Sequence, residues 1–392
     1  MAPQTLTPLT VMLVAAEASG DILGAGLMRA LRARLGSAGV RFVGLGGHAM
    51  AREGIESPFD IAELAIFGYA DGIRAYPRVL RRARETAAIA AREKPDVAVL
   101  IDSWGFTLRV AHRLREQDPK LPLVKYVGPQ VWASRPGRAR TLAGAVDLLL
   151  SIHAFDAPWF EKAGLKTVFV GNPALARDFS AADPARLLTH IGAGEGEPIL
   201  LVLPGSRRGE IRRMLPPFEE VVDRLKATRP GLHVVMPVAS TVADVVREGV
   251  AGWRNPPHLI EDEALKADAF VAADVALACS GTVTTELALA GVPMVIAYRL
   301  GPVTHFAASL LIRTPYITLF NVAAGREVAP ELIQTRCTGE ALARELGKRL
   351  DDPGFAAAQA TEQTAALEKM GRGQGDPSDQ AAGALIAFLK AG

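Results

Sequence analysis

Two glycine-containing segments in the second half of the chain carry the residue types that bind a diphosphate. Residues 203–211 read LPGSRRGEI, and residues 279–286 read CSGTVTTE. Each segment follows an apolar run and leads into a helix-like pattern. Glycine lets a ligand approach the backbone, and the free amides at a helix start attract anions. Arginine and hydroxyl groups add further donors. Together the segments indicate a nucleotide diphosphate site at the ends of parallel strands, as in a sugar-nucleotide enzyme.

The side chains of these segments have separable roles. Arg207 would neutralise the charge that grows on a departing diphosphate, and Glu286 would accept hydrogen bonds from a ribose. The remaining predicted contacts are Gly205, Ser206, Ser280, Gly281 and Thr282. A second interpretation stays open, in which Ser206 caps a surface turn and Ser280 or Thr282 caps a helix. The two interpretations are compatible, because a capped helix start is also a phosphate site.

A third polar segment, residues 321–327, reads NVAAGRE and lies further along the second half. Its asparagine amide and its arginine guanidinium are hydrogen-bond donors of the type that phosphates and uracil accept. We therefore predict that Asn321 and Arg326 reach the nucleotide.

Two carboxylates in the first half directly follow apolar runs. Glu17 stands in an AEASGD segment after the first run, and Asp102 follows Val97–Ile101. An inverting sugar transfer needs a carboxylate that takes the proton from the attacking hydroxyl. We predict Asp102 for that role and Glu17 as its partner or as a ligand for a hydroxyl. The alternatives are local: Ser19 and Asp21 are natural helix caps, and Asp102 could form an Asx turn.

Other residues of the first half would face an acceptor or a lipid surface. Trp132, in a GPQVWASR segment, would form a stiff wall near a cleft or would anchor a surface loop. Residues 65–80 and 306–313 combine apolar side chains with arginines, as segments at a bilayer interface do. Ordinary core helices show the same pattern. The predicted acceptor and lipid contacts are Ser19, Phe67, Tyr69, Arg78 and Trp132.

The composition is that of a globular chain and excludes several classes of protein. The 392 residues suffice for two domains, and 49% hydrophobic with 22% charged residues is typical of α/β proteins. A net charge of +2 provides no general attraction for nucleic acid. Two cysteines are too few for a disulfide framework and fit a reducing cytoplasm. No apolar run reaches the ~18 residues that a membrane-spanning helix needs.

We predict neither a metal nor a cofactor. The seven histidines show no ligand spacing. No Asp-x-Asp pair occurs where a divalent ion would bridge phosphates. Arginine and backbone amides would therefore have to stabilise the leaving diphosphate.

Short apolar runs alternate with helical patterns along the whole chain, which predicts parallel sheets covered by helices on both faces. The expected strands of the first half are 11–16, 41–44, 97–101, 123–127, 148–151 and 167–170. Those of the second half are 199–203, 233–237, 269–271, 275–278 and 294–297. The clearest helical patterns are 21–35, 76–91, 137–145, 213–229 and 282–290.

A strong turn at residues 171–173 (GNP) separates the two series of strands. We predict two doubly wound, Rossmann-like domains that face a cleft, the glycosyltransferase-B arrangement. Residues 1–172 would form the acceptor and lipid domain, and residues 173–351 the UDP-sugar domain. Two helices in residues 352–392 would return to the first domain or pack on that of a partner.

Motifs spread over almost the whole chain occur, in the same order, in one known family. The most specific are AEASGDILGAG at 16–26 and the segment around Asn321. Others are KPD at 94–96, ID at 101–102, YV at 126–127, VWA at 131–133, LPGSR at 203–207, SGT at 280–282 and YR at 298–299. With these motifs the chain resembles the lipid-A-disaccharide synthase family of glycosyltransferase-B enzymes.

The resemblance implies a reaction and a set of roles. A diacylglucosamine would pass from its UDP carrier to the 6-hydroxyl of 2,3-diacylglucosamine 1-phosphate, giving a β-1,6 disaccharide and UDP in lipid A biosynthesis. Asp102 would be the catalytic carboxylate and Glu17 a supporting residue, with Arg207, Glu286 and Asn321 as nucleotide contacts. The family also implies a peripheral protein on the inner face of the inner membrane. It further implies a homodimer that exchanges its last helices.

The chain departs from the family pattern at Gly105, Ser134, Asn172 and Thr285. The family usually has an aspartate, a tryptophan, a histidine and a leucine there. The missing acidic residue and histidine bear on acceptor handling and acyl-chain preference, and not on the UDP site. Two other functions stay open: another UDP-sugar enzyme of this fold, such as an acetylglucosamine epimerase, or a membrane-surface protein that has lost catalysis.

Overall fold

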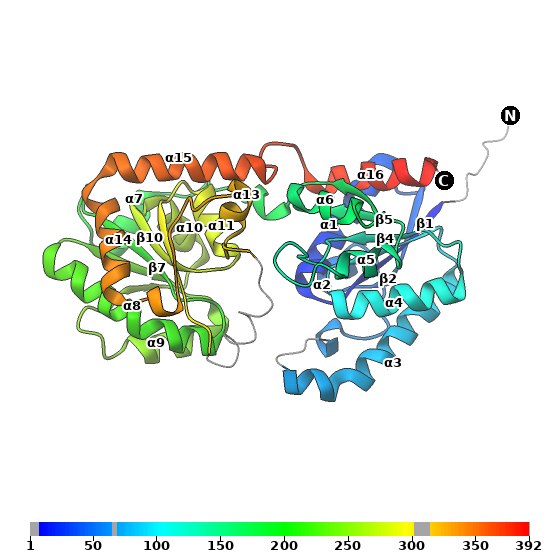
Figure 1. The fold of residues 1–392 in the computed structure, drawn as a ribbon, viewed down its shortest axis with the longest axis horizontal. Coiled ribbons are helices and arrows are strands. Elements are labelled where there is room, and N and C mark those ends of the chain that lie inside the picture. The colour runs from blue at the N-terminus through cyan, green and yellow to red at the C-terminus, as the bar shows by residue number, and fades with distance from the viewer. Residues whose placement is uncertain (1–7, 65–68, 302–313, 392) are drawn as a thin grey trace. The chain divides into compact units, whose positions relative to one another are not determined.

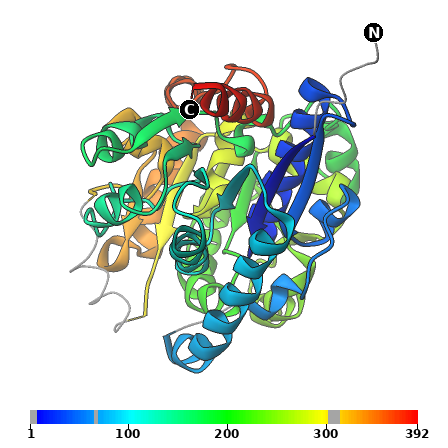
Figure 2. The same cartoon turned by 90° about the vertical axis from the view of Figure 1, so that its right-hand side faces the viewer.

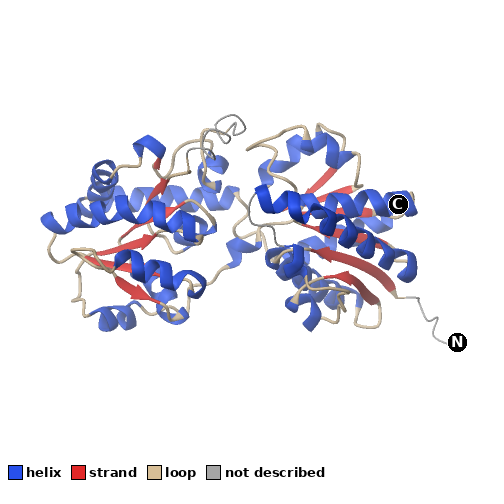
Figure 3. Ribbon diagram, turned by 90° about the horizontal axis from the view of Figure 1, so that it is seen from below, coloured by secondary structure: helices blue, strands red, loops and turns tan. Residues whose placement is uncertain are grey.

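The computed structural model describes residues 8–64, 69–301 and 314–391, which form two compact units (Figure 1). The first unit runs to Pro173 and takes up the chain again from Gly373, and the second holds Ala174–Arg372. Among the described residues, each unit is built on one six-stranded parallel sheet. Figure 3 shows the strands of each sheet in red between layers of helices in blue.

The first sheet has the order β2-β1-β3-β4-β5-β6. Its strands are β1 (Leu9–Ala15), β2 (Val40–Leu45), β3 (Val97–Ile101), β4 (Leu123–Tyr126), β5 (Leu148–Ser151) and β6 (Lys166–Phe169). The helices around it are α1 (Ala18–Leu35), α2 (His48–Arg52), α3 (Tyr69–Glu93), α4 (Trp104–Gln117), α5 (Arg138–Ala143), α6 (Ala157–Glu161) and α16 (Pro377–Ala391). Short 3-10 turns lie at Ile61–Leu64 and Ala154–Asp156. Figure 2 looks at this unit, with β1 and β2 side by side in dark blue.

Burial of both faces explains why the strands read as continuous apolar runs. In β1, Met12 and Val14 belong to the core that α3 and α4 cover, whereas Leu13 and Ala15 belong to the core that α1 and α16 cover. Successive strand residues point to opposite faces of a sheet. A strand with helices on both sides therefore favours an apolar residue at every position.

The second sheet has the order β12-β11-β10-β7-β8-β9. Its strands are β7 (Ile199–Leu203), β8 (His233–Pro237), β9 (His258–Ile260), β10 (Val275–Cys279), β11 (Met294–Tyr298) and β12 (Glu331–Ile333). The helices are α7 (Pro184–Ile191), α8 (Arg208–Thr228), α9 (Ala243–Val250), α10 (Glu263–Ala272), α11 (Thr282–Leu289), α13 (Leu319–Ala324), α14 (Gly339–Asp351) and α15 (Pro353–Lys369). Further 3-10 turns lie at Pro173–Ala176, Ser240–Val242 and Gln334–Arg336.

Each sheet reverses its winding direction at one point. In the first sheet the reversal lies between β1 and β3, where Ala15 pairs with Ile101. In the second it lies between β7 and β10, where Leu203 pairs with Ala278. Open α/β sheets bind ligands outside the carboxyl ends of the strands at such a switch point. Each unit therefore has one expected binding edge, and the predicted residues follow the strands that meet there.

The last two helices divide between the units, which corrects one prediction. α15 packs on α11, α13 and α14, and its buried Gln359 donates a hydrogen bond of 2.8 Å to the carbonyl of Met294. α16 packs on α1, where Arg34 pairs with Asp379 at 2.7 Å. The prediction that residues 352–392 return together to the first domain is wrong for α15, because its buried face belongs to the core of the second unit.

Candidate functional site

The binding edge of the first unit carries two carboxylates at the switch point. Glu17 follows β1 and is exposed, and Asp102 follows β3 and is partly buried. Ser19 donates a long hydrogen bond of 3.4 Å from Oγ to Asp102 Oδ2, so three predicted residues share this edge. Asp21 does not cap its own helix. Its carboxylate instead accepts three backbone N–H bonds at the start of α2.

The backbone is strained where it passes Asp102. The φ angles of Asp102 and Ser103 are 46° and 40°, both in the left-handed region. For residues other than glycine this region costs roughly 1–2 kcal/mol each. Val127, just after the neighbouring strand β4, has a φ of 70°, which is a genuine outlier for a β-branched residue. Because such strain collects at functional sites, it supports this edge as the site.

A buried lysine that no sequence motif indicates lies beneath this edge. Lys125 in β4 is 2% exposed, and its ammonium donates to the carbonyl of Asp102 and to Thr107 Oγ1. Burial lowers the pKa of Lys125 to about 7, against the opposing effect of the Asp102 and Glu17 carboxylates. A lysine inside an apolar run of a central parallel strand is the signal that could have identified it.

Trp132 is held by a buried carboxyl group that no motif indicates. Its indole N–H donates to Asp156 Oδ1 at 3.0 Å, and its ring meets that of Phe155 edge-on with centroids 5.2 Å apart. Ser151 donates to Asp156 Oδ2 at 2.7 Å. The Trp132 side chain is therefore held in one orientation by residues at and after the end of β5, and its role as a wall stays a prediction.

Burial raises the pKa of Asp156 to about 6, against the hydrogen bonds from Ser151 and Trp132. Its ordinary value is 3.8, so the folded state holds this proton more tightly than the unfolded chain does. The stabilisation is complete below about pH 4 and is lost as the pH rises through about 6. We expect urea denaturation to show that, between about pH 4 and pH 7, the wild type loses roughly 3 kcal/mol of unfolding free energy relative to Asp156→Asn.

The neighbouring His153 has the opposite effect on the pH dependence of stability. Burial lowers the pKa of His153 from 6.5 to about 4, so its contribution to stability is present above about pH 6.5 and is lost as the pH falls toward 4. Both proteins contain His153, so its effect cancels when the two curves are subtracted. Parallel curves for wild type and Asp156→Asn would contradict the role given to Asp156.

The predicted lipid-facing residues lie only partly within the described chain. Phe67 and residues 306–313 are outside it, and α3 begins at Tyr69, whose side chain is also outside. Arg78 is exposed on α3, and Tyr76 on the same helix is 48% exposed. The described part of α3 thus presents basic and aromatic side chains to solvent.

The binding edge of the second unit begins with the turn after β7. Gly205 has a φ of 110°, and a side chain there would collide with the Glu210 carboxylate, so the turn requires glycine. The buried Glu210 accepts from the backbone N–H of Ser206 at 3.2 Å and from the Tyr298 hydroxyl at 2.6 Å. Arg207 is exposed at the N-cap position of α8. Glu210 belongs to the segment 203–211, and the sequence alone does not show that it shapes the turn.

The helices that start at this edge lack side-chain caps. Neither the Arg207 N-cap of α8 nor the Gly281 N-cap of α11 makes a side-chain capping bond, whereas Asp262 caps α10 in this way. Ser280 instead donates to the carbonyl of Ile317 at 3.3 Å. The capping interpretation of these segments is therefore wrong for α8 and α11. Uncapped amides and a positive dipole end are the features that bind an anion.

Glu286, the predicted ribose acceptor, lies on α11 with an unforeseen partner. Its carboxylate pairs with Arg177. The guanidinium of Arg177 lies over the rings of Phe179 and Phe270, 5.1 and 5.4 Å from their centroids. The arginine orients the carboxylate, and a quarter of the Glu286 side-chain surface (26%) stays exposed to solvent.

The segment around Asn321 requires a correction. Asn321 is fully buried, and its amide accepts from the N–H groups of Val328 and Ala329 and donates to Ala329 and Glu331. All its hydrogen-bonding capacity is used inside the protein, so it shapes the loop rather than contacting a nucleotide. Arg326 is exposed and pairs with Glu362 of α15 at 2.8 Å. It would have to leave that partner to reach a phosphate.

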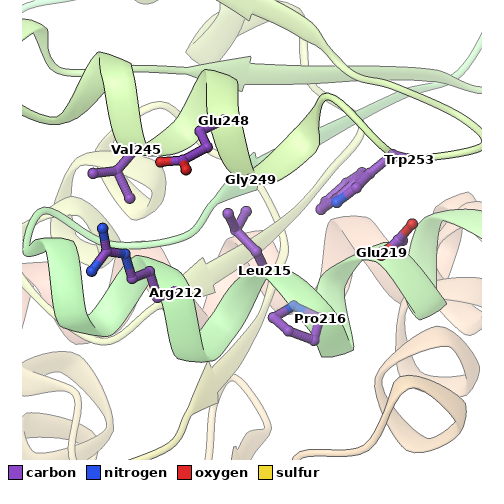
Figure 4. A pocket seen from close by; sticks show the side chains of 8 residues that line it. All are labelled: Arg212, Leu215, Pro216, Glu219, Val245, Glu248, Gly249 and Trp253. Atoms are coloured by element: carbon purple, nitrogen blue, oxygen red, sulfur yellow. The ribbon is translucent and has the colours of Figure 1, made fainter.

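A pocket of about 390 Å³ lies between α8 and α9, away from the predicted residues. Figure 4 shows the side chains that line it: Arg212, Leu215, Pro216, Glu219, Val245, Glu248, Gly249 and Trp253. No predicted site residue is among them. Within residues 8–64, 69–301 and 314–391, no group of three or more His, Cys, Asp or Glu side chains is arranged to hold a metal ion.

Two Rossmann-like sheets with a ligand-binding edge on each define the glycosyltransferase-B class of α/β proteins. The solved structure of UDP-GlcNAc 2-epimerase from Neisseria meningitidis, bound to UDP-GlcNAc, is similar with a TM-score of 0.64. The likeness covers 98% of this chain and 100% of that one at 12% identity. At this level of identity it shows the fold alone.

Sequence comparison defines the family within this class. The family model described as lipid-A-disaccharide synthetase matches residues 11–384. Lipid-A-disaccharide synthase from Paramagnetospirillum magneticum is 41% identical over 98% of each chain, and that from Bradyrhizobium diazoefficiens is 42% identical over 97% of each. The chain belongs to the lipid-A-disaccharide synthetase family and is a glycosyltransferase. This assignment sets aside the epimerase alternative.

Proposed function

We propose that the chain transfers 2,3-diacylglucosamine from UDP to the 6-hydroxyl of 2,3-diacylglucosamine 1-phosphate. The products are a β-1,6 disaccharide 1-phosphate and UDP. The observation that carries this proposal is the pair of switch points. One presents Glu17 and Asp102, and the other presents Arg207 beside two uncapped helix starts. Family membership supplies the identity of the sugars.

The residues of the two edges have the chemistry for an inverting displacement. Asp102 accepts the proton of the acceptor hydroxyl while the oxygen of that hydroxyl forms a bond to the anomeric carbon of the donor. The bond from that carbon to the diphosphate oxygen breaks, and UDP leaves with the electron pair. Arg207 and the amides of α8 and α11 stabilise the charge that develops there. Glu17 supports the acceptor side, and Trp132 forms a wall for it.

A peripheral position on the inner face of the inner membrane follows from the same proposal. The substrates are lipids, and the basic and aromatic surface of α3 suits an anionic bilayer. No helix within the described ranges is long and apolar enough to cross a membrane. The homodimer with exchanged C-terminal helices stays a prediction, since α16 packs on α1 of its own chain here.

The experiment that tests the proposal is UDP release from UDP-2,3-diacylglucosamine, with and without the diacylglucosamine 1-phosphate acceptor. We expect release that depends on the acceptor and equals the amount of disaccharide 1-phosphate detected by mass spectrometry. Binding of UDP without turnover would overturn the proposal in favour of the catalytically silent alternative. Release of UDP without an acceptor would overturn it by showing hydrolysis of the donor rather than transfer.

Glu286 is expected to distinguish UDP from 2′-deoxy-UDP, because a carboxylate that accepts from the ribose diol gains a charge-assisted hydrogen bond. Such a bond contributes about 1.5–3 kcal/mol, so the wild type should prefer UDP by roughly 10–100-fold in Kd. In Glu286→Gln the preference should fall to a few-fold. Calorimetric titration of both nucleotides into both proteins measures this.

Glu263→Gln provides the control for that comparison. Glu263 lies on α10, also in the second unit, and pairs with Lys266. Its replacement should leave both dissociation constants unchanged. Equal discrimination by wild type and Glu286→Gln would show that the carboxylate does not contact the ribose and serves only Arg177.

A further inference from the structure

The candidate base Asp102 is tied to β4 at both of its backbone polar groups. Its N–H donates to the carbonyl of Tyr126 at 2.8 Å, and its carbonyl accepts from the ammonium of Lys125. The same ammonium donates to Thr107 Oγ1 at 2.7 Å, and that hydroxyl lies 2.8 Å from the Asp102 carbonyl. Two adjacent residues of β4 and one of α4 therefore hold the two peptide groups on either side of the Asp102 Cα.

Both peptide groups belong to the strained turn. Asp102 and Ser103 both have positive φ angles, and such backbone persists only where its surroundings over-determine it. The Lys125 ammonium reaches it from inside the sheet, where it is shielded from water. Placement of the Asp102 carboxylate at the binding edge thus depends on a contact made through the carbonyl of the same residue.

The charged groups that act on the Lys125 ammonium both belong to the candidate site. The charged groups that act on it are the carboxylates of Asp102 and Glu17. Its register neighbours are Leu100 in β3 and Leu149 in β5, and the α4 group that it contacts by a hydrogen bond is the uncharged Thr107 hydroxyl. A cation shielded from solvent is an expensive group to bury, and here its two electrostatic partners are the two carboxylates of the candidate site.

We propose that Lys125 is a positioning residue, which holds the Asp102 backbone in its left-handed turn and so places the Asp102 carboxylate at the binding edge. This inference rests on the proposed role of Asp102 as the base. Burial lowers the pKa of Lys125 to about 7, while Asp102 and Glu17 oppose that shift. The ammonium is therefore present under neutral conditions in a substantial fraction of molecules.

The test replaces Lys125 by methionine, which fills a similar volume without the charge. The Asp102 carbonyl keeps a partner in this variant, because the Thr107 hydroxyl also donates to it at 2.8 Å. Misplacement of a catalytic group costs up to ~10²-fold in rate, so we expect kcat to fall about 10–100-fold. Both KM values should change less than threefold.

Two further variants test the backbone contact. Thr107→Val keeps the cation and removes the hydroxyl that also donates to the Asp102 carbonyl, so it should lower kcat several-fold and leave both KM values nearly unchanged. Lys266→Met is the matched control, because Lys266 is another buried lysine, in the second unit and paired with Glu263. It should preserve kcat and both KM values. If Lys125→Met does not fold, Thr107→Val alone decides, and a wild-type kcat for it overturns the positioning role.

Hydrogen–deuterium exchange gives a readout that does not depend on activity. We expect exchange of the peptide that contains Asp102 and Ser103 to accelerate at least tenfold in Lys125→Met, with little change elsewhere in β1 and β3. A wild type without acceptor-dependent UDP release, combined with this local loosening, would refute the proposed function and leave the backbone role standing. Folded Lys125→Met with wild-type exchange and wild-type kcat would refute the inference itself.

Discussion

Asp102→Asn is expected to lower kcat for acceptor-dependent UDP release about 10³-fold. The amide has nearly the same shape as the carboxylate but cannot take a proton from the attacking hydroxyl, and a positioned general base contributes 10²–10⁴-fold. Because the substitution leaves the backbone contacts of Asp102 to Tyr126 and Lys125 in place, KM for both substrates should change little. Initial rates measured against each substrate separate the two parameters.

Asp118→Asn is the matched control for that measurement. Asp118 is exposed and ends α4, the helix that begins just after Asp102, so it removes the same charge from the other end of the same element. Its kcat should stay within twofold of wild type. An Asp102→Asn enzyme that keeps more than a tenth of the wild-type kcat would exclude Asp102 as the base and direct attention to Glu17.

Most of the fold could be predicted because the strands of a parallel sheet appear in a sequence as continuous apolar runs. The runs 97–101, 148–151, 199–203 and 233–237 match strands β3, β5, β7 and β8 residue for residue. Two strands, β9 and β12, have three residues each and are too short to show a pattern. Residues 269–271, predicted as a strand, belong to α10, whose start is fixed when Asp262 accepts from two backbone amides. A short apolar run fits both structures, and the cap decides between them.

The candidate site, too, could be predicted only in part from the sequence. Glu17 and Asp102 could be placed at a binding edge because each directly follows a predicted strand, and Arg207 because it lies in the turn after one. Strand ends of a parallel sheet meet at one edge. Their supports could not, because each depends on contacts between distant elements. Lys125 is understood only once β3 lies beside β4, and Arg177 only once it meets Glu286. Asn321 was given the wrong role for the same reason, since its partners at 328–331 become visible only when the loop folds back.

Arg207→Met is expected to lower kcat by about 10²–10³-fold. The negative charge on the diphosphate increases as the glycosidic bond breaks, so a guanidinium beside it stabilises the transition state more than the bound substrate. Loss of one such preorganised donor typically costs this much. The substitution should leave the turn unchanged, because Gly205 and Glu210 fix its shape independently of Arg207. Arg207→Lys should recover only part of the loss, since lysine lacks the bidentate fork.

Arg208→Met tests whether the effect belongs to that guanidinium or to positive charge at the start of α8. Arg208 is the next residue, equally a cation of the first helical turn, but it pairs with Asp244 at 2.5 Å. If Arg207 contacts the diphosphate directly, Arg208→Met should keep kcat within about twofold while Arg207→Met does not. If instead the two variants lose similar activity, the helix start attracts the nucleotide as a general field. Salt should then weaken UDP binding to the wild type and to both variants in parallel.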